Sequence, residues 1–187
     1  MSRPKTVSDL EVMDHALGIL AEKGMGFTLT DLAGRVGLSR ATLIQRFGDR
    51  EAILRRMAEH EVETTQAWLA GLPVDQGKVG LTAFLELIVG SMGAGEGFSA
   101  RVAIAALEAQ DPILRAFADR RYALVQAAIV ARLPESPKRQ AVAEHLHAVI
   151  AGATMQWVAS DRSVGLSEYV LLRLRPALEW LPDHLTS

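Results

Sequence analysis

The sequence predicts an all-α protein with an N-terminal three-helix helix-turn-helix domain and a C-terminal helical bundle. Apolar residues recur at spacings of three and four through most of the chain, which is the period of an amphipathic helix. No segment shows the sustained two-residue alternation of a half-buried strand. Residues 28–51 also carry helix start and stop signals about every ten residues, a spacing that suits a helix-turn-helix. We therefore expect about nine helices, in one domain at residues 1–52 and a second at residues 53–187.

The helix-turn-helix is predicted from its capping residues. Thr28 is a candidate N-cap, and Asp31 three residues later completes an acidic version of the capping box. The helix after Thr28 can end at Gly37, because glycine tolerates the left-handed conformation that follows many helices. Ser39 can cap the next helix, and Asp49 can cap the one after it. Two short helices joined by a glycine turn are thus followed directly by a longer helix.

The other helices are predicted from apolar periodicity and from proline and glycine breaks. The sequence Gly71-Leu72-Pro73 interrupts the pattern, so residues 71–77 are expected to form a linker. Asp111-Pro112 and Ser136-Pro137 each place a capping residue before a proline at the first helical position. Pro176 should kink or shorten the last helix, since it has no backbone N–H. The expected helices lie at residues 8–23, 29–36, 40–47, 50–70, 78–92, 100–109, 112–133, 137–160 and after Ser167.

The composition is that of a globular protein. Apolar residues make up 49% of the 187 residues and charged residues 22%, which argues against disorder and against a fibrous class. The absence of cysteine excludes disulfides, thiol catalysis and cysteine-ligated metal. Residues 1–11 lack the apolar core of a signal peptide, and the charge-free run at 145–160 is shorter than the roughly 20 apolar residues of a bilayer-spanning helix. We expect a soluble, cytoplasmic protein that does not enter a membrane.

The distribution of charge is more informative than the net charge of −2. Residues 1–58 contain nine Lys and Arg against seven Asp and Glu, whereas residues 59–187 contain eleven against fifteen. From residue 34 to residue 47 there are three arginines and no acid. This local excess of positive charge is what contact with nucleic-acid phosphates requires.

In its N-terminal part the sequence resembles the TetR family of bacterial one-component transcription regulators. The resemblance rests on Thr28, Asp31-Leu32-Ala33, Val36-Gly37-Leu38-Ser39, Ala41-Thr42-Leu43, Phe47 and Asp49-Arg50-Glu51. It implies a symmetric homodimer whose N-terminal domains bind double-stranded operator DNA and whose C-terminal domains hold a small-molecule effector. It also implies that the last two helices form the dimer interface as a four-helix bundle. Ligand binding would then change the separation of the two DNA-binding domains through the helix at 50–70, and no cofactor is expected.

The helix at residues 40–47 is expected to present the DNA-binding residues. Leu43 and Phe47 lie four residues apart and should pack inward. This leaves for DNA contact Arg40, Ala41, Thr42, Ile44, Gln45 and Arg46. Arg40 and Gln45 are the candidates for base edges, because an arginine suits guanine and a glutamine amide suits adenine. The candidates for holding phosphates and setting the register are Thr28, Thr42, Arg46 and Arg50.

Two of these positions depart from the family pattern. A tyrosine that commonly contacts the DNA backbone is usual where Ile44 stands, and Arg50 replaces a usual lysine while keeping its charge. Ile44 cannot donate a hydrogen bond, although it could contact a thymine methyl group. The alternative for the basic residues is that they are solvated charges on short helices.

The C-terminal domain contains candidates for an effector site and for a dimer interface. A cavity for the effector, expected to be apolar, would be lined by Trp68, Phe84, Ile88, Phe98, Leu107, Phe117, Met155 and Trp157, although each could instead be ordinary core. The dimer interface is expected to contain Val142, Leu146, Val149, Ala153, Leu171, Leu174 and Leu178. No metal site is expected, since His145 and His147 lie two residues apart on one helix and diverge.

The sequence thus predicts a ligand-responsive transcriptional regulator, with repression as the expected action, that binds a pseudo-palindromic operator as a dimer. A helical adaptor of the same fold that no longer binds DNA is the alternative, because Ile44 removes a usual phosphate contact. An enzyme is the third class. It is disfavoured, since no nucleophile has a recognisable base partner.

Overall fold

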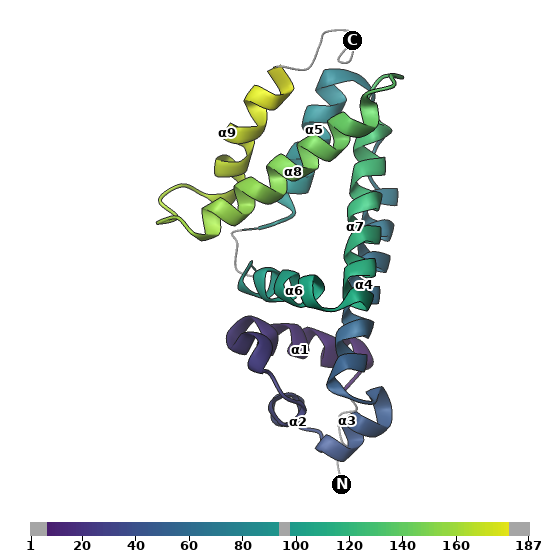
Figure 1. Ribbon diagram of the computed structural model, residues 1–187, viewed down its shortest axis with the longest axis vertical. Helices are drawn as coiled ribbons and strands as arrows, with labels where there is room; N and C mark the ends of the chain where they lie inside the picture. The colour runs from purple at the N-terminus through teal and green to yellow at the C-terminus, as the bar shows by residue number, and fades with distance from the viewer. Residues whose placement is uncertain (1–6, 94–97, 180–187) are drawn as a thin grey trace. The chain divides into compact units, whose positions relative to one another are not determined.

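The computed structural model describes residues 7–93 and 98–179 (Figure 1). These residues contain nine α-helices, one short 3₁₀ helix and no strand, so the all-α prediction is confirmed. The elements are α1 (Asp9–Lys23), η1 (Gly24–Gly26), α2 (Leu29–Val36), α3 (Arg40–Phe47), α4 (Arg50–Ala70), α5 (Gly77–Gly90), α6 (Phe98–Gln110), α7 (Pro112–Val130), α8 (Arg139–Val158) and α9 (Leu166–Glu179).

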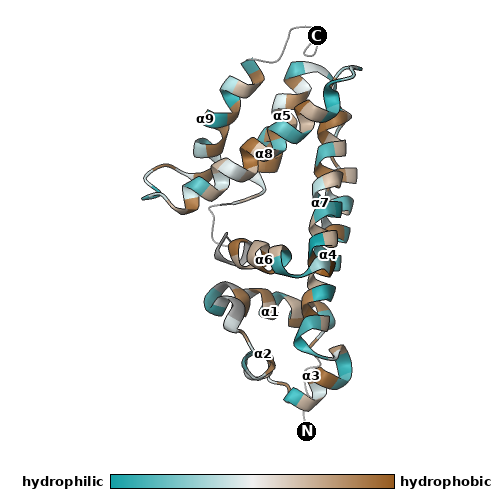
Figure 2. Cartoon of the chain, viewed as in Figure 1, coloured by the Kyte–Doolittle hydropathy of each residue, from teal (hydrophilic) through white to brown (hydrophobic). Residues whose placement is uncertain are grey.

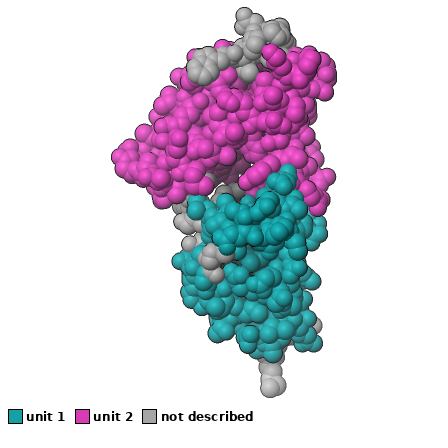
Figure 3. Space-filling model, viewed as in Figure 1, with its two compact units in different colours: residues 1–64, 97–119 teal, residues 65–96, 120–187 magenta. Residues whose placement is uncertain are grey.

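The helices group into two compact units (Figure 3). Unit 1 comprises residues 1–64 and 97–119, and unit 2 comprises residues 65–96 and 120–187. Unit 1 therefore contains the whole of the expected domain at residues 1–52. It also contains all of α6, most of α4 and the start of α7. Helices α4 and α7 each contribute residues to both units.

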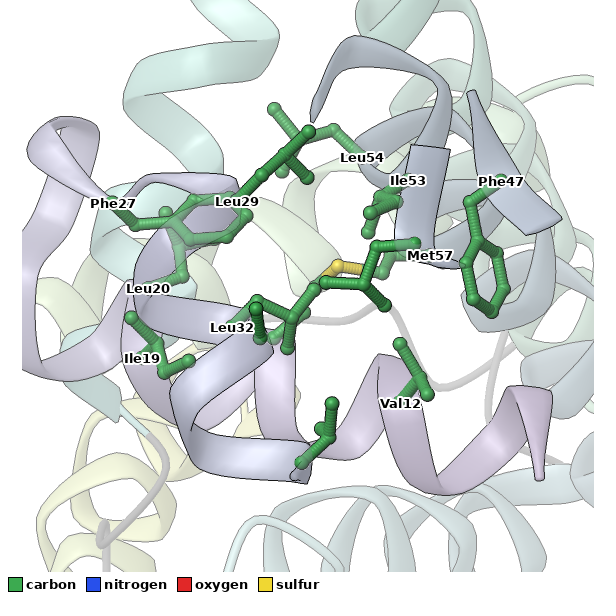
Figure 4. Close-up of a cluster of buried hydrophobic side chains, with 14 of the residues drawn as sticks. Val12, Ile19, Leu20, Phe27, Leu29, Leu32, Phe47, Ile53, Leu54 and Met57 are labelled. Atoms are coloured by element: carbon green, nitrogen blue, oxygen red, sulfur yellow. The ribbon is translucent and has the colours of Figure 1, made fainter. Parts of the chain in front are cut away.

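Unit 1 is built around one cluster of buried hydrophobic side chains (Figure 4). Helix α6 packs against α1, and both contribute to the cluster with α2, α3, α4 and the first turn of α7. Leu43 and Phe47 are 0% and 4% exposed, which confirms that they point inward from α3. Helices of eight residues such as α2 and α3 are not stable alone, and each buried leucine or phenylalanine contributes about 1.5–3 kcal/mol. The cluster therefore holds the two short helices in place.

In unit 2, α9 packs against both α5 and α8. The core is formed by the apolar stripes of these helices with Ile129 of α7 and Leu133, which follows α7. Trp157 of α8 is 4% exposed and its indole N–H donates to the Val164 carbonyl at 2.7 Å. Helix α9 continues through Pro176 to Glu179, and Leu181 lies outside the described residues.

Several helix ends differ from the sequence prediction by one to three residues, and hydrogen bonds explain two of these differences. The N–H groups of Arg132 and Leu133 donate to carbonyls three residues back, at 3.0 and 3.1 Å, so the chain leaves α7 in a tighter turn. Helix α8 starts at Arg139 instead of at the predicted proline, because Ser136 forms a turn. Its hydroxyl accepts the Lys138 N–H at 3.2 Å, and its carbonyl accepts the Arg139 N–H at the same distance.

The linker between α4 and α5 is held by a buried arginine. The Arg132 side chain is 2% exposed, and its guanidinium donates to the carbonyls of Ala128, at 2.7 Å, and Pro73. The same group lies 3.6 Å from the centre of the Phe84 ring. In return, the Gly77 N–H donates to the Arg132 carbonyl at 3.1 Å. The linker is thus tied to the end of α7 at two points.

Gly80 lets this linker fold back onto the first turn of α5. A Cβ atom at Gly80 would lie 2.1 Å from the carbonyl oxygen of Asp75 and 2.5 Å from its carbonyl carbon. Both distances are far inside van der Waals contact, so glycine is required here by close approach of the backbone. Burial lowers the pKa of Arg132, and the negative charge of Asp75 partly opposes this shift.

None of the described helices is long and apolar enough to cross a membrane. Figure 2 shows hydrophilic residues distributed along the helices of both units.

Candidate nucleic-acid interface

Helix α2 begins with the predicted capping box. The Thr28 hydroxyl accepts the Asp31 N–H at 3.2 Å, and the Thr28 N–H and hydroxyl donate to the Asp31 carboxylate at 2.9 and 2.7 Å. Lys23 forms an ion pair with the same carboxylate. These contacts, that of Lys23 first, lower the pKa of Asp31 to about 2. The first turn of α2 is therefore fixed while Thr28 stays exposed.

The turn between α2 and α3 also has the predicted geometry. Gly37 adopts φ 70° and ψ 25°, in the left-handed region that favours glycine. Ser39 caps α3 by accepting the Thr42 N–H at 3.0 Å, and the two hydroxyl oxygens lie 2.8 Å apart. Asp49 then caps α4 by accepting the Ala52 N–H at 2.7 Å. The Thr42 hydroxyl, a predicted phosphate ligand, is thus engaged in the cap of its own helix.

The outer face of α3 consists of four exposed residues, Arg40, Ala41, Ile44 and Gln45. Ile44 is 44% exposed, an apolar side chain between a cationic and an amide side chain. Thr42 and Arg46 are half-buried at the edges of this face. A short helix with such a face can enter a major groove, where arginine and glutamine recognise base edges and an aliphatic side chain contacts a thymine methyl group.

Arg40 carries the free positive charge of this face, since it makes no ion pair or hydrogen bond with the described residues. The basic segment at residues 34–47 is less positive than its composition suggests, because Arg35 pairs with Glu22 at 3.1 and 2.6 Å. The hydrogen bonds of this pair lower the pKa of Glu22 and raise that of Arg35.

Arg46 is also engaged within the chain. Its guanidinium donates to the Val7 carbonyl at 2.9 Å and forms an ion pair with the Asp9 carboxylate. It also lies 5.1 Å from the centre of the Phe47 ring. The sequence did not predict this contact, because 37 residues separate Asp9 from Arg46. An acid at the start of α1 is also already explained by its favourable interaction with the helix dipole.

Arg50 anchors the start of α4 to the end of η1. Its Nε donates to the Phe27 carbonyl at 2.9 Å, its guanidinium lies 5.0 Å from the centre of the Phe27 ring, and it pairs with Glu51 at 3.4 Å. These groups border a surface hollow of about 370 Å³ that is also lined by Thr28, Leu29, Thr30, Arg40 and Asp49. The hollow brings together the start of α2, the start of α3 and the start of α4, with Thr28, Arg40 and Arg50 at one site.

The predicted effector residues are divided between the two units. Phe84, Ile88 and Trp157 are buried in unit 2, where Trp68 and Met155 are 36% and 47% exposed. Leu107 belongs instead to the hydrophobic cluster of unit 1, and Phe117 is half-buried in the same unit. The side chain of Phe98 lies outside the described residues.

The predicted dimer residues lie mostly on the inner sides of α8 and α9. Within the single chain, Leu146, Ala153, Leu174 and Leu178 are buried, while Val142, Val149 and Leu171 are half-buried. The two helices pack against each other, and α9 also packs against α5. Their exposed apolar residues are different ones: Ala141, Ala148, Ala151, Gly152 and Met155 on α8, and Leu172 and Pro176 on α9.

Residues 12–57 match the family model described as bacterial regulatory proteins, tetR family. No curated protein matches the sequence significantly.

Several solved structures share the fold over nearly the whole chain. A TetR transcription regulator from Haloarcula marismortui is 15% identical over 96% of this chain and 98% of its own, with a TM-score of 0.79. A candidate transcriptional regulator from Saccharomonospora viridis, solved in complex with choline, is 19% identical over 92% and 96%, with a TM-score of 0.72. SmeT, the repressor of a multidrug efflux pump of Stenotrophomonas maltophilia, is 17% identical over 92% and 89%, with a TM-score of 0.69. At these identities the likeness establishes the shared fold.

Proposed function

We propose that this chain, whose residues 12–57 match the model of bacterial regulatory proteins of the tetR family, is a ligand-responsive transcriptional repressor. It would bind a pseudo-palindromic operator as a homodimer. The observation that carries the proposal is the outer face of α3. Arg40 and Gln45 are both exposed on a capped helix whose opposite side is fixed in the core of unit 1. Such a helix presents a fixed hydrogen-bonding pattern to a major groove without first having to fold.

The proposed DNA contacts differ in strength of support. Arg40 is free to bind a guanine, and Gln45 an adenine, each worth about 1–3 kcal/mol of discrimination. Ala41 and Ile44 would supply apolar contact beside them. Thr28 and Arg50 would contact phosphates from the rim of the hollow, and Thr42 from the edge of α3. The hydroxyl and guanidinium groups of these residues also hold the local fold. Arg46 would have to share its charge with Asp9.

A homodimer would place two copies of α3 about one helical turn of DNA apart, roughly 34–36 Å. We propose that the exposed sides of α8 and α9 form the interface, because the inner sides already bury their leucines within one chain. Ala148, Ala151 and Gly152 would permit close helix approach, and Met155 and Leu172 would supply apolar area.

We propose that the effector is an apolar small molecule bound in unit 2 near Phe84, Ile88 and Trp157. The Saccharomonospora regulator was solved in complex with choline, so a protein of this fold can bind a small molecule. Induction requires that the effector bind the state that cannot bind DNA more tightly than the state that can.

The proposal is tested by selecting bound sequences from a random duplex pool. The wild type should enrich a pseudo-palindrome, and its affinity should fall steeply with salt. Arg40→Ala should change the preferred base pair in each half-site, whereas Arg50→Ala should weaken all sequences about equally. Arg120→Ala is the matched control, because Arg120 is an exposed arginine of unit 2 without contacts among the described residues.

An unchanged preference in Arg40→Ala would contradict the base contact assigned to that residue. Failure of the wild type to bind any duplex would favour the helical adaptor. The feature that favours this alternative is Ile44, which cannot donate a hydrogen bond to phosphate.

A further inference from the structure

Asp9 is bound by two arginines at one end of the helix-turn-helix. It is the first residue of α1, and its carboxylate pairs with Arg46 of α3 and, at 3.4 Å, with Arg56 of α4. Both guanidinium groups also lie near the Phe47 ring, at 5.1 and 5.3 Å from its centre. We call Val7, Asp9, Arg46, Phe47 and Arg56 the Asp9 cluster.

The cluster occupies the donors that a phosphate would need. One terminal nitrogen of Arg46 donates to the Val7 carbonyl at 2.9 Å and the other to Asp9. The Arg46 side chain keeps only 26% of its surface exposed, compared with 45% for Arg56. Arg46 therefore has to leave Asp9, or share its charge, before it can bind DNA.

The cluster also reduces the charge available to DNA. Two arginines and one carboxylate carry a net +1 instead of +2. Lys23 and Arg35, the other basic residues of α1 and α2, are neutralised by Asp31 and Glu22. Because non-specific DNA affinity depends on the number of phosphates that uncompensated cations neutralise, each intramolecular pair lowers it.

We infer that Asp9 is an intramolecular competitor of DNA phosphate for Arg46 and Arg56, and that it sets how tightly this domain binds DNA of any sequence. The inference rests on the proposed DNA-binding function of α3. Arg40 lies outside the Asp9 cluster and would then have a larger role in sequence preference than Arg46 or Arg56. The reason is that weak non-specific binding leaves more of the total affinity to base contacts.

The test uses the full chain and a non-specific duplex of about 30 base pairs at about 50 mM salt, so that no operator is needed. Asp9→Asn is compared with Asp14→Asn, which removes the same charge from an exposed residue of α1 without contacts among the described residues. Asp9→Asn should bind roughly three- to tenfold more tightly than Asp14→Asn, and its salt dependence should steepen by about 0.9 for each arginine released. Adding Arg46→Ala should remove most of this gain.

Equal binding by Asp9→Asn and Asp14→Asn would overturn the inference, and so would no binding by either. If Asp9→Asn does not fold, as judged by circular dichroism, the binding of Arg46→Ala to the same non-specific duplex tests the inference instead. The inference expects it to bind within about threefold of the wild type, and a tenfold or larger loss would make Arg46 a phosphate ligand in its own right. A wild type without sequence preference in the random-pool selection would refute only the proposed function, because this comparison uses non-specific DNA.

Discussion

Replacing Gly80 by alanine sets two effects of opposite sign against each other. Alanine is better than glycine inside a helix by about 0.8–1 kcal/mol, so propensity alone predicts a more stable α5. The added Cβ, however, would lie 2.1 Å from the Asp75 carbonyl oxygen. Ordinary contact needs well over 3 Å, so the linker would have to move by more than about 1 Å.

The linker cannot move without losing its contacts to Arg132. The hydrogen bond from the Arg132 guanidinium to the Pro73 carbonyl has a charged donor and contributes about 1.5–3 kcal/mol, and that from the Gly77 N–H contributes about 0.5–1.5 kcal/mol. Gly80→Ala should lose most of the free energy of these two hydrogen bonds and gain only the higher helix propensity of alanine. It should therefore be less stable than the wild type by about 2 kcal/mol.

Urea unfolding followed by circular dichroism measures the difference. Gly90→Ala is the matched control, because Gly90 ends the same helix and a Cβ there would meet nothing within 4 Å. It should be neutral or stabilised by up to about 1 kcal/mol. If Gly80→Ala were as stable as Gly90→Ala, the linker would not be held as tightly as its contacts to Arg132 indicate, and the reasoning would be refuted.

Three further changes test other parts of the structure. The pKa of Asp31 is lowered to about 2 in the folded chain, so its stabilising contacts are complete above the ordinary carboxyl pKa near 4 and are lost as pH falls toward 2. The difference in unfolding free energy between the wild type and Asp31→Asn, measured by urea titration, should therefore shrink over that range. A constant difference would contradict the assignment. Leu172→Glu should weaken the proposed dimer by about 2–5 kcal/mol in sedimentation equilibrium. It should leave the fold intact, because Leu172 is 58% exposed in the single chain. An unchanged dimer would exclude the exposed side of α9 as the interface. Ile44→Tyr should restore a phosphate hydrogen bond and tighten binding to all duplexes by about 1 kcal/mol in fluorescence anisotropy, whereas unchanged affinity would show that the hydroxyl does not reach the DNA backbone.

The helix-turn-helix was predictable because its signals are local. Thr28 and Asp31 cap α2 through hydrogen bonds that span three residues, and Gly37 takes a backbone conformation that glycine alone adopts at low cost. Leu43 and Phe47 face the core because they lie four residues apart on one helix. Each of these features depends on residues that a sequence places side by side.

The assignment of the C-terminal residues was less secure for the opposite reason. Apolar spacing on α8 and α9 identifies a buried side, but it does not say whether that side is buried by the same chain or by a partner. The structure places Leu146 and Leu174 in the core of the single chain. Leu107 likewise belongs to the core of unit 1, since α6 packs on α1, which lies about 90 residues earlier in the sequence.

The sequence by itself determined an all-α fold, the capped turn between α2 and α3, and the residues on the outer face of α3, because helix periodicity and capping are interactions between near neighbours. Only the tertiary structure decided which of the arginines on that domain are free. Arg46 is paired with Asp9 and Arg35 with Glu22, whereas Arg40 has no such contact among the described residues. The charge available to bind DNA depends on these long-range pairs, and pairs between distant residues form only when the chain folds.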